Sequence, residues 1–154
     1  MAMVCFSLFT ELPTVEAQVD DAFWFVAPEV TNSHGDDPVV LRFASFDEPA
    51  IITVTMPANP DNFPAQLLTL DGNEAISLDL TPWLELVENK PFDQVHNKGI
   101  RIESTANISA YYEVNPSCGC NPDIFALKGA NGEGTEFLIP FQTFLNNTYS
   151  NSPS

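Results

Sequence analysis

The chain has 154 residues, of which 21 are Asp or Glu and only 5 are Lys or Arg, so its formal net charge is −16. This acidity argues against binding to nucleic-acid phosphates or anionic lipid surfaces, because both need a basic patch. Hydrophobic residues make up 44% of the chain, enough for one domain with a packed core, and no stretch approaches the roughly 20 apolar residues of a membrane-spanning helix.

Residues 1–18 differ in character from the rest of the chain. Their first ten residues are apolar, and the small residues Val15 and Ala17 precede a candidate cleavage point before Gln18. This pattern resembles the end of a secretory signal peptide, although no Lys or Arg precedes Arg42 to form a basic start. The alternative is an ordinary first strand in which Phe6, Leu8 and Leu12 pack inward.

Nine short runs separated by Pro, Gly, Asn and Asp predict β-strands. The run 50–56 shows the pattern well, since Ile52, Val54 and Met56 alternate with Thr53 and Thr55. Asp71-Gly72-Asn73 is a strong hairpin-turn signal between two of the runs. The predicted strands are 22–27, 39–46, 50–56, 66–70, 75–80, 99–104, 107–114, 123–128 and 135–140.

One helical turn is predicted at 81–90, with Thr81 as its cap and Pro82 at its first helical position. The predicted fold class is therefore all-β, a β-sandwich of about nine short antiparallel strands with at most one short helical turn. Residues 19–145 form this domain, and the polar segment 146–154 is expected to be a tail or linker.

Three stretches together resemble a known family. They are DAFWFVAPE at 21–29, NKGIRIES at 97–104 followed by NISAYY at 107–112, and DIFALK at 123–128 followed by GTEFLIP at 134–140. In order and spacing they are similar to the N-terminal domain of the IgG-Fc-binding-protein type found in large secreted and surface proteins of the Bacteroidetes.

The resemblance implies a non-catalytic domain of a larger secreted protein that often ends in a secretion and surface-attachment domain. Family domains continue past the last motif, so this chain resembles a first half. We therefore expect residues 19–154 alone to be marginally stable or self-associating, with an unpaired edge near the apolar run that ends at Phe144. Light scattering and thermal melts, with and without the downstream sequence, test this.

Cys118 and Cys120, separated by one glycine, are the sharpest local feature. Residues two apart in a strand lie about 6.6 Å apart on the same face, near the upper end of the Cα range for a disulfide. A local disulfide is the favoured state in an exported protein, and free or intermolecular thiols are the alternatives. Together with His34 and His96 they form a Cys₂His₂ set by count, but the spacing matches no zinc module.

The loop at 32–37 is rich in oxygen atoms and is a candidate Ca²⁺ site, with Asn32, Asp36 and Asp37 as ligands. It lacks the ordered pattern of an EF-hand, and Asn, Gly and Asp are also the usual residues of turns. No other cofactor is expected.

No nucleophile elbow, metalloprotease motif, P-loop or dinucleotide fingerprint occurs in the sequence. We therefore predict a non-enzymatic adhesion or scaffold module, secreted or at the cell surface, whose partner is a protein or glycan besides the rest of its own chain. The alternative is a carbohydrate-binding module of a secreted glycan-degrading enzyme, with Tyr111 and Trp83 as the stacking residues. A hydrolase acting alone is a third, weaker hypothesis.

Overall fold

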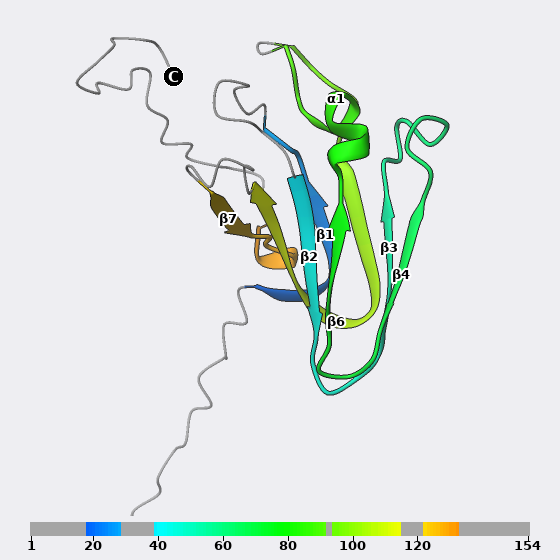
Figure 1. Ribbon diagram of the computed structural model, residues 1–154, viewed down its shortest axis with the longest axis vertical. Helices are drawn as coiled ribbons and strands as arrows, with labels where there is room; N and C mark the ends of the chain where they lie inside the picture. Colours follow the sequence, from blue (N-terminus) through cyan, green and yellow to red (C-terminus); the bar gives the residue numbers. More distant parts are fainter. Residues whose placement is uncertain (1–17, 29–38, 92–93, 115–121, 133–154) are drawn as a thin grey trace, which may run out of the picture.

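The computed structural model describes residues 18–28, 39–91, 94–114 and 122–132, and in these residues the chain is all-β, as the sequence predicts (Figure 1). A short 3₁₀ turn, η1 (Thr81–Trp83), leads directly into the single helical turn α1 (Leu84–Val87), and a second 3₁₀ turn, η2, spans Ala130–Gly132. The strands are β1 (Val19–Phe25), β2 (Val39–Ser45), β3 (Ala50–Thr55), β4 (Gln66–Leu70), β5 (Ala75–Asp79), β6 (Ile100–Val114) and β7 (Asp123–Ala126).

The two strands predicted at 99–104 and 107–114 are one continuous strand, β6. The segment between them, Thr105-Ala106, contains neither Gly nor Pro, so nothing forces the backbone to leave the extended conformation. The first part of β6 pairs with β3 on one side and β1 on the other. The last part pairs with β2 and β7.

β6 therefore belongs to two layers, β4-β3-β6-β1 and β5-β2-β6-β7, in which neighbouring strands are antiparallel. A ring contact shows that the layers face each other. Phe25 pairs with Ile100 at one end of β6, yet its ring centroid lies 4.5 Å from that of Tyr112 near the other end. Residues 100 and 112 of a straight strand would be about 40 Å apart. The sheet must therefore fold over at the middle of β6, which gives the sandwich its core.

The predicted alternation is confirmed in the core. Leu41, Phe43 and Ser45 of β2 are buried, as are Ile52, Val54 and Met56 in and after β3. The inward residues of β6 are likewise buried, namely Ile100, Ile102, Ile108, Ala110, Tyr112 and Val114. Each of these strands thus presents one face to the core and leaves the other as an outer face of the sandwich.

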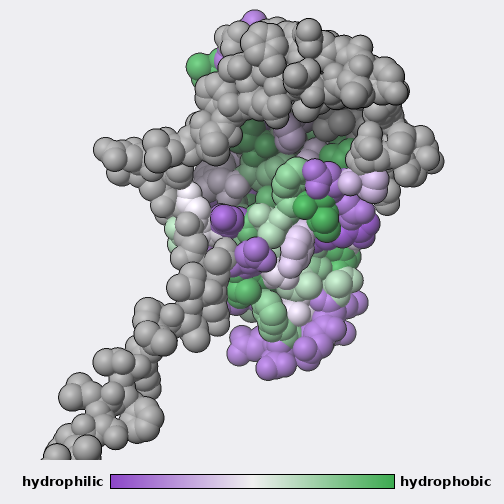
Figure 2. All heavy atoms as spheres, turned by 90° about the vertical axis from the view of Figure 1, so that its left-hand side faces the viewer, coloured by the Kyte–Doolittle hydropathy of each residue, from purple (hydrophilic) through white to green (hydrophobic). Residues whose placement is uncertain are grey.

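The turn at residues 71–74 joins β4 to β5 and packs against the turn that joins β2 to β3 at the lower end of the sandwich. The hairpin predicted here is wrong, because β4 pairs with β3 and β5 pairs with β2, so the turn connects the two layers. A Cβ on Gly72 would lie 2.5 Å from the carbonyl oxygen of Asp47, so glycine is needed for the close approach. Asn73 takes the left-handed backbone conformation, with φ 61°. Figure 2, which views the side carrying β7, shows hydrophilic side chains gathered at this end and hydrophobic ones above them.

The opposite end is covered by η1 and α1, in the predicted place but with a different start. Thr81 is not the cap, because the capping position is Leu80 and no side chain caps η1. The Thr81 hydroxyl instead accepts a hydrogen bond from the backbone N–H of Val39 (3.2 Å), and the Thr81 N–H donates to the Asp79 carboxylate (2.8 Å). The predicted cap is wrong because the Thr81 hydroxyl bonds to the distant strand β2 and not to the helical turn that follows it.

Lys98 holds this covering segment in place. Its ammonium donates to the backbone carbonyls of Glu88 (2.7 Å) and Glu85 (3.3 Å). Glu88 itself is fully buried and pairs with Lys90 at 2.9 Å. The hydrogen bonds that Lys90 donates to the carboxylates of Glu88 and Glu85 raise the pKa of Lys90 above its usual value. The Asn-Lys-Gly stretch before β6 therefore has a structural role, which is to fasten α1 across the end of the sandwich.

Candidate functional site

Several residues singled out in the sequence lie outside the described residues, namely Cys118 and Cys120 of the disulfide candidate, His34, and the calcium candidates Asn32, Asp36 and Asp37. The same holds for residues 1–17, the predicted strand 135–140 and the polar tail. Within the part of the chain that is described, no three His, Cys, Asp or Glu side chains are grouped so that they could hold a metal ion. None of the described helices is long and apolar enough to cross a membrane.

Tyr111, the first stacking candidate, lies on the outer face of the layer β5-β2-β6-β7, opposite to the buried row of β6, and is half-buried. Its neighbour across β2 is Arg42, whose guanidinium donates to the carboxylate of Glu113 and to the hydroxyl of Ser77 (2.9 Å). The hydrogen bond to Glu113 raises the pKa of Arg42. The charge beside Tyr111 is therefore already neutralised by the protein.

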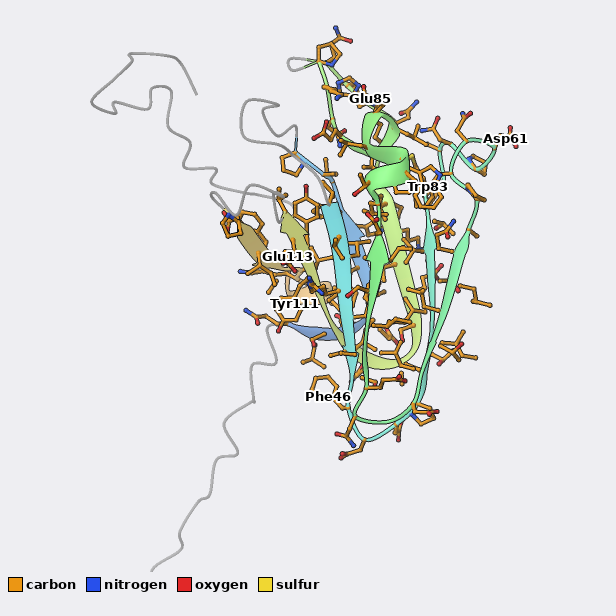
Figure 3. All side chains as sticks on the ribbon, viewed as in Figure 1. Phe46, Asp61, Trp83, Glu85, Tyr111 and Glu113 are labelled. Carbon is orange, nitrogen blue, oxygen red and sulfur yellow. The ribbon has the colours of Figure 1, made fainter. Side chains whose placement is uncertain are left out.

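Trp83, the second stacking candidate, lies beside α1, away from Tyr111 (Figure 3). It is half-buried, because its ring packs edge-on against the buried ring of Phe63 with centroids 5.2 Å apart. A hollow of about 440 Å³ lies next to it, and among the described residues that line this hollow the charged one is Glu85, which pairs with Lys90. The structure does not bring Tyr111 and Trp83 together into one platform.

Trp24 of β1 is a more exposed aromatic than either stacking candidate. Phe23 is buried and Phe25 half-buried, so Trp24 between them points outward and 58% of it is exposed. It pairs with Arg101 across the sheet, and the guanidinium lies 5.9 Å from the centre of the indole ring. This is a cation–π arrangement, which is favourable at exposed sites.

The outer face around Trp24 continues across the layer β4-β3-β6-β1. Arg101 pairs with Thr55, Glu103 pairs with Thr53, and Thr53 pairs in turn with Leu67, which is 71% exposed. We call this surface the Trp24 face. It consists of the outward side chains Ala22, Trp24, Ile51, Thr53, Thr55, Leu67, Thr69, Arg101 and Glu103.

The five basic residues of the chain differ in how far their charges are already bound by other groups of the protein. Arg42, Lys90 and Lys98 are all bound to groups of the protein itself. Arg101 pairs with Glu103 at 2.8 Å, but both side chains remain almost half exposed. Within the described residues, the ammonium of Lys128 forms neither a hydrogen bond nor an ion pair. The two cations least occupied by the fold are thus Arg101 and Lys128, and both lie beside Trp24.

A hollow of about 250 Å³ lies between these residues, lined by Ala22, Phe23, Trp24, Arg101, Lys128, Gly129 and Gly132. Its far wall is fastened to β1 by Asp20, whose carboxylate accepts a hydrogen bond from the N–H of Ala130 at 2.6 Å. This bond, with others from the backbone of Asp21 and Ala22, lowers the pKa of Asp20. A Cβ on Gly129 would lie 2.2 Å from the Asp20 carboxylate, so a glycine is needed where the two segments touch.

The sequence held a signal for part of this site. The run Phe23-Trp24-Phe25 can be read with alternate residues inward, and Ile100-Arg101-Ile102 alternates clearly. Both patterns place Trp24 and Arg101 on outer faces. Their pairing depends on the register between β1 and β6, which are more than 70 residues apart in the sequence, and Lys128 joins them only through the contact of Asp20 with the segment after β7.

Comparison with known proteins gives little to set beside this site. No protein family matches the sequence, and no curated protein matches it significantly. A solved structure, that of Thermotoga maritima 1070, is similar over 77% of this chain and 97% of the other, with a TM-score of 0.42 and 15% sequence identity. A likeness at this level supports no conclusion about function.

Proposed function

We propose that this chain is a non-catalytic recognition module, an adhesion or scaffold domain of a larger secreted or surface protein, and that it binds its partner through the Trp24 face. The observation that carries the proposal is the exposed Trp24 in register with Arg101 beside a hollow. Trp and Arg are the residues that most often dominate the energy of protein interfaces.

The physical properties of the face support this role. An exposed indole costs free energy in water that a partner would recover by covering it, at about 25 cal/mol per Å² of apolar surface. The threonines of β3 and β4 provide hydroxyl groups elsewhere on the same face that can bond to a polar partner. A face built on paired strands is also rigid, so little conformational entropy is lost on binding.

A second candidate function, a carbohydrate-binding module of a glycan-degrading enzyme, is favoured by the same tryptophan. Sugar rings pack their apolar side on exposed aromatic rings, and the hollow next to Trp24 supplies polar groups at the edge of such a ring. The two functions differ in the partner, a protein for the first and a glycan for the second.

The test uses beads coated with the full chain and exposed to printed panels of extracellular proteins and of glycans. We expect retention on at least one panel, and a loss of about tenfold or more in Trp24→Ala, in the range found for central interface tryptophans. The matched control is Phe46→Ala, which removes an aromatic ring that is 45% exposed at the lower turns and does not belong to the Trp24 face (Figure 3). Retention that survives Trp24→Ala, or none on either panel, would refute the proposal.

A further inference from the structure

We propose that the hollow beside Trp24 binds a sugar residue that carries a carboxylate or sulfate group, as in an acidic glycan. The inference rests on the proposed recognition function and specifies the ligand for the same site. It follows from the size of the hollow, from the side chains that line it and from the charge of the rest of the chain.

The size of the hollow suits one sugar ring. Pockets for drug-sized molecules have volumes of about 300–1,000 Å³. The hollow beside Trp24, at about 250 Å³, lies just below that range. Trp24 provides an apolar wall against which the C–H side of a pyranose ring can pack, and it stays accessible because the ring lies over Gly99, which has no side chain.

Two other residues that line the hollow, Arg101 and Lys128, provide positive charge. Arg101 has five N–H donors, of which the ion pair with Glu103 uses one nitrogen, and Lys128 has three donors with no partner among the described residues. Asp20 is close by, but its carboxylate is occupied by backbone N–H groups, with Ala130 the nearest. An acidic group on the sugar would therefore form charge-assisted hydrogen bonds with Arg101 and Lys128.

The backbone next to Lys128 is tethered to β1. The tether is the bond from Ala130 to Asp20, and Gly129 is buried at that contact. A site with a fixed backbone loses less entropy on binding than one on a free loop.

The charge of the whole chain restricts the type of acidic ligand. With a net charge of −16, the molecule repels a densely charged polyanion that comes within about one Debye length, which is about 8 Å at physiological ionic strength. A ligand with one charge per sugar ring is repelled much less, and it gains the contacts with Arg101 and Lys128 at short range. The structure therefore points to glycans with isolated acidic residues.

The experiment is a pair of NMR titrations of the full chain with methyl β-D-glucuronide and methyl β-D-glucoside, which differ only in the carboxylate at C6. We expect the glucuronide to bind about tenfold more tightly. A tenfold difference in affinity is close to the contribution of one hydrogen bond to a charged group. In Lys128→Met this preference should fall to about threefold or less while binding of the glucoside is unchanged. Sodium acetate, which has the charge without the ring, should give no response.

Each other outcome overturns the inference in a distinguishable way. If the two glycosides bind equally and Trp24→Ala abolishes the binding of both, the site does not recognise the acidic group. That result would leave the recognition function intact. A response to acetate equal to that of the glucuronide would show an anion contact without sugar recognition. No response to either glycoside at about 10 mM would overturn the inference alone, because the bead assay tests the recognition function separately.

Discussion

Replacing Lys98 by methionine should destabilise the protein strongly, although Lys98 lies in a loop. The methylene stem is kept, but the ammonium that binds the carbonyls of Glu88 and Glu85 is lost. A hydrogen bond from a charged donor contributes about 1.5–3 kcal/mol, and the 2.7 Å bond to Glu88 is the shorter of the two. We take the loss as about 2–3 kcal/mol, a large part of the 5–15 kcal/mol that holds a typical domain folded.

The matched control is Lys128→Met, the same substitution at a lysine whose ammonium has no partner within the described residues. For a chain of this size, each kcal/mol shifts the melting temperature by about 2–4 °C, so Lys98→Met should melt about 4–12 °C lower. Lys128→Met should melt with the unchanged protein, since surface substitutions of this kind have small effects. Thermal melts followed by circular dichroism, together with urea titrations, measure both. Equal melting of the two variants would refute the structural role assigned to Lys98.

Three further predictions concern the contacts that shape the two ends and the hollow. Asp20→Asn should lower the free energy of unfolding by about 1 kcal/mol at pH 7 by weakening the bond from Ala130. Because the pKa of Asp20 is lowered in the folded state, this stabilisation is present above the unfolded value of about 3.9 and is lost as the pH falls through the folded value. The difference between the two proteins in urea titrations should therefore be constant from about pH 5 to 8 and shrink below about pH 4; a difference that grows on acidification would contradict this. Gly72→Ala should cost more than about 1 kcal/mol in the same titrations, because its Cβ would meet the carbonyl oxygen of Asp47. Asn73→Gly should cost nothing while Asn73→Ala costs about 1 kcal/mol, since φ at this position is 61°; a reversed order would contradict the turn assignment.

The fold could be predicted from the sequence where local patterns decide it. Strict alternation in Ile52-Thr53-Val54-Thr55-Met56 predicted β3 correctly, and the Asp-Gly-Asn signal marks a turn. That turn does not form a hairpin, because β4 pairs with β3 and β5 pairs with β2. The pattern failed where tertiary contacts outweigh it. The break expected between 104 and 107 does not occur, because β6 exchanges one set of partner strands for another without leaving the extended conformation. Likewise the Thr81 hydroxyl bonds to β2 rather than to its own helix.

The candidate site was harder to predict because it depends on register. Trp24 was not chosen as a stacking residue, since an uninterrupted apolar run does not single out which of its residues points outward. Its pairing with Arg101 requires the register of β1 against β6. The position of Lys128 requires in addition the contact between Asp20 and Ala130, which are 110 residues apart. Tyr111 and Trp83 were chosen as aromatics on plausible elements, and the structure leaves both half-buried.

The claim that recognition occurs at the Trp24 face is tested most directly by the indole N–H signals in a proton–nitrogen NMR spectrum of the full chain. The chain contains two tryptophans, Trp24 and Trp83, and each lines one of the two hollows, so the two indole signals report on the hollows separately. The variant Trp24→Phe lacks one of the signals and thereby assigns both. On addition of methyl β-D-glucuronide, our account predicts that the Trp24 signal shifts with saturation while the Trp83 signal stays in place. A shift of Trp83 alone, with Trp24 unchanged, would contradict it.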